Sequence, residues 1–190
     1  GTPFNLNTSL WYKDGHDFAG WSATAGTQAI LYTQNQSVTL YANTNIYAQW
    51  TAKVFTVTYS SNGGAGSASI ASQNYTFGTS AITSFATVGT MTRAGYTFGG
   101  WATTATGTTA LTTLTPTANQ TLHAIWTPRA FNIVFNGNTS TSGSMINLSM
   151  TSGVAKALTA NAYLKTGFSF QGWNTASNGS GISYGDTQTV

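Results

Sequence analysis

The sequence predicts a mainly β chain of small modules arranged end to end, with an α+β fold as the alternative. Three observations predict it. A nine-residue motif rich in glycine and aromatic residues occurs three times, a second motif occurs twice at a spacing of 76 residues, and apolar and polar side chains alternate in the segments beside them. Such internal repeats are typical of modular arrays, in which each repeat is one small structural unit.

The glycine and aromatic motif covers residues 13–21, 93–101 and 165–173. In each copy an aromatic residue precedes the Trp by three positions, which is not the two-residue period of a regular strand. We therefore expect a strand that bends or bulges at the intervening glycine, because glycine tolerates irregular backbone geometry. The framework positions are Gly15, Phe18, Gly20, Trp21, Gly95, Tyr96, Phe98, Gly100, Trp101, Gly167, Phe168, Phe170, Gly172 and Trp173.

The second motif predicts the strand that closes each module. It reads Ile-Tyr-Ala-Gln-Trp-Thr at 46–51 and Leu-His-Ala-Ile-Trp-Thr at 122–127, so that Trp50 and Trp126 are equivalent. Apolar residues at alternate positions indicate a half-buried strand.

A third alternating segment opens the modules. Residues 55–59 (Phe-Thr-Val-Thr-Tyr) and 131–135 (Phe-Asn-Ile-Val-Phe) are again 76 positions apart, and both are followed by Gly, Asn and Ser. These are turn residues, and Gly and Asn accept a positive φ.

Together the motifs divide the chain into three predicted modules. Residues 1–51 form the C-terminal part of a first module, 52–127 a complete second module, and 128–190 a third module that lacks its last strand. The incomplete ends have two interpretations: the chain is a fragment of a longer repeat protein, or another copy supplies the missing strand by edge addition.

Composition narrows the class of protein. Charged residues make up 5% of the chain, against roughly 25% in ordinary soluble domains. The six basic residues are scattered, which argues against a nucleic-acid partner, and no run approaches the roughly 18 apolar residues of a membrane span. There is no cysteine, so disulfides and thiolate metal sites are excluded.

The densest polar group contains Lys13, Asp14, His16 and Asp17. Two carboxylates and an imidazole suit a metal site or acid–base catalysis, but His16 stands where the other copies have Tyr96 and Phe168, and the aspartates do not recur. His123 likewise replaces Tyr47. We therefore expect no catalytic residues, no metal and no cofactor, and a protein that is not an enzyme.

Six tryptophans raise the question of sugar binding, because exposed rings stack on carbohydrates. Five of them are framework positions that we expect to fill the module cores. Trp11 has no counterpart and lies beside Tyr12. These two residues are the candidates for a ligand contact, or Trp11 is an extra plug for the first module.

Three segments carry a family resemblance: residues 61–64 (Ser-Asn-Gly-Gly), the motif at 93–101 and residues 121–127 (Thr-Leu-His-Ala-Ile-Trp-Thr). Together they resemble the Listeria-Bacteroides repeat, also called the internalin B-repeat family, of bacterial surface proteins. The resemblance implies β-grasp-like modules in secreted or cell-wall-attached proteins, with a spacer or adhesive role and no catalytic residues. Very low charge and the Thr-rich segment 103–110 depart from typical members.

Three functions follow as hypotheses. The first is a non-enzymatic, extracellular stalk, fibre or adhesin segment on a bacterial surface, whose partners are neighbouring modules. The second is a module that binds glycans or a host or cell-surface protein. The third is a filament subunit that is completed by strand exchange with copies of itself.

Overall fold

The computed structural model describes residues 1–7, 11–65 and 70–190, and over these residues the chain is all β. The mainly β prediction is confirmed, and the described residues contain no helix. The strands are β1 (Phe4–Asn5), β2 (His16–Ser22), β3 (Ser37–Val38), β4 (Tyr47–Ala52), β5 (Val54–Ser60), β6 (Gln73–Thr76), β7 (Tyr96–Ala102), β8 (Gln120–Pro128), β9 (Ala130–Ile133), β10 (Leu148–Thr151), β11 (Trp173–Asn174) and β12 (Ser183–Tyr184).

The chain divides into two compact units, and each is described by itself. The first comprises Gly1–Met91 with Gly100–Ile125, and the second comprises Thr92–Gly99 with Trp126–Val190.

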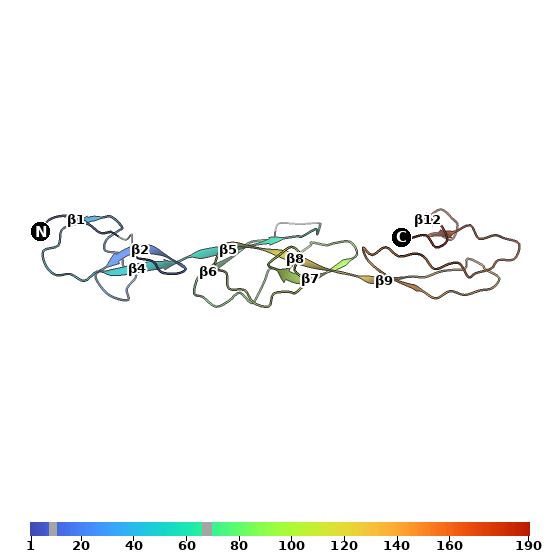
Figure 1. The fold of residues 1–190 in the computed structure, drawn as a ribbon, viewed down its shortest axis with the longest axis horizontal. Helices are drawn as coiled ribbons and strands as arrows, with labels where there is room; N and C mark the ends of the chain where they lie inside the picture. The colour runs from blue at the N-terminus through green and yellow to red at the C-terminus, as the bar shows by residue number, and fades with distance from the viewer. Residues whose placement is uncertain (8–10, 66–69) are drawn as a thin grey trace. The chain divides into compact units, whose positions relative to one another are not determined.

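The largest sheet has the strand order β6-β5-β8-β7 (Figure 1). β5 is antiparallel to β6 and parallel to β8, with Val57 opposite Gln120 and Tyr59 opposite Leu122. The alternation that predicted both strands places Val57, Leu122 and Ala124 in the interior, where none of them exposes any surface. A parallel pair needs a long crossover, and the described part of that connection contains strands and loops and no helix.

The expected bulge is present in β2. This strand pairs antiparallel with β4, and the register shifts between Phe18 and Gly20. Gly20 has a φ of 147°, and a Cβ atom there would lie 2.7 Å from the carbonyl oxygen of Tyr32. A side chain at this position would therefore collide with the neighbouring backbone, which explains the glycine.

One repeated core position lies outside the motifs. Leu6, Ile82 and Leu158 follow each other at 76-residue intervals and are 5–7% exposed. Each donates its backbone N–H across to a returning segment, to Gln36, Leu114 and Gln188 respectively. The segment before Lys13 therefore belongs to the repeat, as the equivalent of the residues around Ile82.

The second unit differs from the sequence-based expectation in two places. The strand expected at 131–135 ends at Ile133, and the third motif copy is extended in strand form only at Trp173–Asn174. In the first two copies the equivalent residues form the seven-residue strands β2 and β7, which pair with β4 and β8. Residues 168–172 have no such partner among the described strands, which accounts for their irregular backbone.

Candidate functional site

Each copy of the glycine and aromatic motif begins with the same turn. The N–H of His16 donates to the carbonyl of Lys13 at 3.1 Å, and the equivalent bonds run from Tyr96 to Arg93 at 2.9 Å and from Phe168 to Lys165 at 3.0 Å. The third residue of each turn is a glycine with φ between 65° and 80°. A turn of this type needs a positive φ at that position, which favours glycine.

The first of these turns is hydrogen-bonded to the predicted second module. The N–H of Lys53 donates to the carbonyl of Gly15 at 2.9 Å, and the N–H of Phe77 donates to the carbonyl of Lys53 at 2.8 Å. The chain from β4 to β5 is therefore held on both sides: by the turn before β2 and by the end of β6.

The same arrangement recurs one repeat later. Arg129 N–H donates to Gly95 at 2.8 Å, and Ser152 N–H donates to Arg129 at 3.0 Å. We call the contacts around Lys53 the first junction and those around Arg129 the second junction.

Side chains cover the first junction. The His16 ring lies edge-on to Phe77 with ring centres 5.6 Å apart, and Lys53 Nζ lies 3.5 Å from Asp17 Oδ1. A Cβ atom at Gly15 would lie 2.2 Å from the Phe77 ring, so only a glycine permits this approach. His16 thus packs as an aromatic residue.

The third turn lies uncovered. Phe168 is 73% exposed, whereas His16 and Tyr96 are half-buried. In the second and third turns a cation lies over the aromatic ring, with Arg93 Cζ 4.2 Å from the centre of Tyr96 and Lys165 Nζ 4.8 Å from that of Phe168.

The framework tryptophans take two kinds of position. Trp21 and Trp101 are buried, while Trp50, Trp126 and Trp173 are half-buried. Trp101 lies 4.7 Å from the ring of Tyr59, and its Nε1 donates to the carbonyl of Ala86 at 2.8 Å.

Equivalent aromatic pairs occur in the other modules at similar distances between ring centres. Trp173 lies 4.7 Å from Phe135, which is the counterpart of Tyr59. The outer pair is also repeated, because Phe18 lies 5.5 Å from Trp50 and Phe98 lies 5.9 Å from Trp126.

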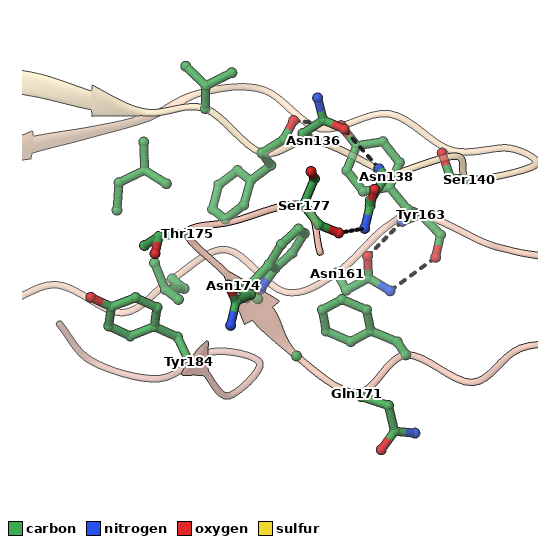
Figure 2. A pocket seen from close by; sticks show the side chains of 18 of the residues that line it. Asn136, Asn138, Ser140, Asn161, Tyr163, Gln171, Asn174, Thr175, Ser177 and Tyr184 are labelled. Carbon is green, nitrogen blue, oxygen red and sulfur yellow. Dashed lines mark hydrogen bonds between the residues drawn. The ribbon is translucent and has the colours of Figure 1, made fainter. Parts of the chain in front are cut away.

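The predicted third module contains an open groove of about 2000 Å³ (Figure 2). Its apolar lining includes Phe131, Ile133, Phe135, Phe170 and Trp173. Figure 2 shows Asn138 reaching Ser177, whose carbonyl accepts a hydrogen bond from the Asn138 Nδ2 at 2.9 Å. We call this feature the third-module groove.

A smaller groove of about 430 Å³ lies beside the two candidate ligand residues. Trp11 lines it together with Trp21 and Trp50. Trp11 is 64% exposed and Tyr12 is 81% exposed. The Tyr12 hydroxyl donates to Asp14 Oδ1 at 3.0 Å, and this hydrogen bond, together with the negative charge of Asp14, raises the pKa of Tyr12.

The polar group at 13–17 is not arranged as a metal site. Over the described residues no group of three or more His, Cys, Asp and Glu side chains could hold a metal ion. His123 is half-buried on β8. Within the same part of the chain, no helix is long and apolar enough to cross a membrane.

Sequence reasoning missed the role of one asparagine. Asn62 has a φ of 47°, and its Nδ2 donates to the carbonyls of Ala105 at 2.8 Å and Ala124 at 2.9 Å. It joins the turn after β5 to a loop and to β8. The sequence did contain a sign of this role, because an asparagine recurs 76 residues later, at Asn138. Asn138 also has a positive φ, of 44°.

Comparison with known proteins identifies the repeat. The family model described as the Listeria-Bacteroides repeat domain matches residues 4–49, 55–125 and 131–190. No curated protein and no solved structure shows significant similarity to the chain.

Proposed function

The chain belongs to the Listeria-Bacteroides repeat family, whose members are typically extracellular surface repeats of bacteria, and we propose that it is a spacer in a stalk, fibre or adhesin. The proposed spacer is non-enzymatic. It consists of the modules 1–51, 52–127 and 128–190. Their framework residues stabilise the fold and take no part in a reaction.

The observation that carries this proposal is the repetition of the junction. A flexible linker has no bonds to the modules on either side, whereas Lys53 and Arg129 each donate to the preceding turn and accept from the following hairpin. Two backbone hydrogen bonds and a packed aromatic pair restrict bending at the first junction. A spacer needs this property, because a stiff connection keeps a distant binding region away from the cell surface.

The low charge supports the same role. Five of the six basic residues lie in the turns or junctions: Lys13, Lys53, Arg93, Arg129 and Lys165. Uncharged Thr, Ser, Asn, Gln and Gly take the place of most charged residues in the sequence, and such residues are hydrated without attracting a specific charged partner.

The experiment is hydrogen exchange at the first junction. Gly15→Ala should place a methyl group against the Phe77 ring and break the contact, so the Lys53 amide should exchange at least about tenfold faster than in the parent. Gly26→Ala is the matched control, because Gly26 also has a positive φ, of 73°, but no atom lies within 4 Å of its Cβ position. A Lys53 amide that is unprotected in the parent would overturn the proposal.

A second candidate is glycan or protein binding through Trp11 and Tyr12. It is favoured by the exposure of both rings next to the smaller groove. A glycan-array signal that Trp11→Ala abolishes without changing the melting temperature would support it. A lower melting temperature of Trp11→Ala, with no glycan signal from the parent, would instead identify Trp11 as a residue that fills the core of the first module.

A further inference from the structure

We propose that Asn62 and Gly63 form a deamidation site that the folded second module protects. While the turn after β5 is closed, Asn62 stays an amide. When the turn opens, its side chain converts to aspartate or isoaspartate, and the turn then loses the two side-chain hydrogen bonds that hold it. This inference does not depend on the spacer role, because it concerns one turn within residues 52–127.

The chemistry is that of an asparagine followed by a glycine. The Gly63 backbone nitrogen, after losing its proton to hydroxide, attacks the Asn62 Cγ atom. A new C–N bond forms, the bond from Cγ to Nδ2 breaks, and ammonia leaves. Water then opens the resulting succinimide at either carbonyl, which yields aspartate or isoaspartate and one added negative charge. Glycine favours the attack because it has no side chain in the way, and asparagine is among the thermolabile residues for this reason.

The first observation is that the Asn62 carboxamide is anchored at the nitrogen that has to leave. Its Nδ2 donates to the carbonyl of Ala105 at 2.8 Å, in the loop after β7, and to the carbonyl of Ala124 at 2.9 Å, on β8. Asn62 and Gly63 are also fixed in a tight turn, with φ values of 47° and 87°. With both bonds in place the carboxamide cannot swing onto the Gly63 nitrogen, so the reaction requires the turn to open first.

The second observation is that both partners of Asn62 are backbone carbonyls, which can only accept hydrogen bonds. A carboxylate has no hydrogen to donate, and it would bring a negative charge against two carbonyl oxygens. Each lost bond to a carbonyl also leaves an acceptor without its partner, which is costly where water is excluded. Deamidation at this one position therefore detaches the turn after β5 from both the loop and β8.

The chain supplies its own comparison, because Asn-Gly pairs also occur at 136–137 and 178–179 and the latter lies in an exposed loop. Asn178 Oδ1 accepts from the N–H of Ser180 at 3.1 Å and from its hydroxyl at 2.7 Å. These bonds draw electrons from Cγ, and among the described residues nothing anchors the Asn178 nitrogen. The Gly179 N–H donates to the carbonyl of Ala176 at 3.0 Å, a bond within one surface turn that opens without unfolding.

The experiment incubates the full chain at mildly alkaline pH with increasing urea and follows the peptides of an acidic digest by mass spectrometry. Without urea we expect Asn178 to convert at least about tenfold faster than Asn62, because only Asn62 has to wait for its turn to open. In urea that unfolds the chain, the two rates should converge. Equal rates in the folded chain, or an Asn62 rate that urea does not raise, would overturn the proposal.

A variant of the core links the reaction to the stability of the module. Trp101 is 3% exposed, and Trp101→Ala destabilises the second module without changing the reacting pair. We expect it to speed conversion of Asn62 about fivefold or more and to leave Asn178 unchanged. Trp11→Ala, at a 64% exposed site, is the matched control and should change neither rate. Acceleration at Asn178 alone would contradict protection by the module.

A second set of variants tests the consequence of the reaction. Asn62→Asp carries the product side chain and tolerates the same left-handed backbone. Its urea midpoint should fall at least as far as that of Asn62→Gly, because the carboxylate removes both donors and adds repulsion. Asn178→Asp, in the exposed loop, should unfold with the parent. An Asn62→Asp chain with the midpoint of the parent would show that the turn closes on a carboxylate, and the proposal would fail.

Discussion

Trp101 connects three segments of the second module. It is part of β7, packs against the tilted ring of Tyr59 of β5, and donates to the carbonyl of Ala86 in the intervening loop. Because it is 3% exposed, Trp101→Ala should lower the free energy of unfolding by about 3–5 kcal/mol. Chemical denaturation measures this loss, with Trp11→Ala, at a 64% exposed site, expected within about 0.5 kcal/mol of the parent. Equal losses for the two variants would contradict the core position of Trp101.

Asn62 has a comparable connecting role through hydrogen bonds. Asn62→Gly preserves the left-handed backbone but removes the bonds to Ala105 and Ala124, so the free energy of unfolding should fall by about 1–3 kcal/mol. Thermal and urea unfolding measure this change. Asn35→Gly changes the same residue type at a φ of 59°, and it should be nearly neutral. If both variants unfold alike, the side-chain bonds of Asn62 add little.

The structural roles of individual residues were harder to predict from the sequence than the strands. The periodic motifs predicted the framework aromatics, because large apolar residues and glycine recur in fixed positions. Asn62 was treated as an ordinary turn residue, since its acceptors lie 43 and 62 positions away in the chain. Leu6 was missed because its neighbours differ from those of Ile82, although both positions are buried.

At the scale of elements, β7 depends on the glycine at the position equivalent to Gly20 of the β2 bulge. Gly100 has a φ of 117°, and a Cβ atom there would lie 2.6 Å from Ala110 Cβ. Gly100→Ala should therefore combine backbone strain of about 1–3 kcal/mol with an overpacking penalty of similar size. Gly89→Ala, at a φ of 60° with open space around it, should cost only about 1–2 kcal/mol. Unfolding by urea compares the two, and a smaller loss at Gly100 would contradict this account of β7.

The strands themselves were largely predictable. Period-two alternation located β5 and β8 within one or two residues, because each has one buried face. The short β6 was not predicted, since Gln73–Thr76 has one buried side chain, Tyr75, and its position depends on pairing with β5. The third motif copy was expected to form a strand like the other two. A strand needs a hydrogen-bonded neighbouring strand as well as a favourable sequence pattern.

At the scale of the whole molecule, the repeat explains how a chain with 5% charged residues and no cysteine is organised. Each described junction reuses one set of backbone bonds, so the same local geometry can be propagated through many modules.

We propose that the junctions hold neighbouring modules, and a distance distribution across the first junction measures this. The chain has no cysteine, so spin labels at Gln28→Cys and Thr103→Cys, two exposed sites, can be placed without background. We predict a narrow distribution by pulsed electron resonance, which Gly15→Ala broadens and Gly26→Ala leaves narrow. A broad distribution in the parent, or one that Gly15→Ala does not change, would contradict the account.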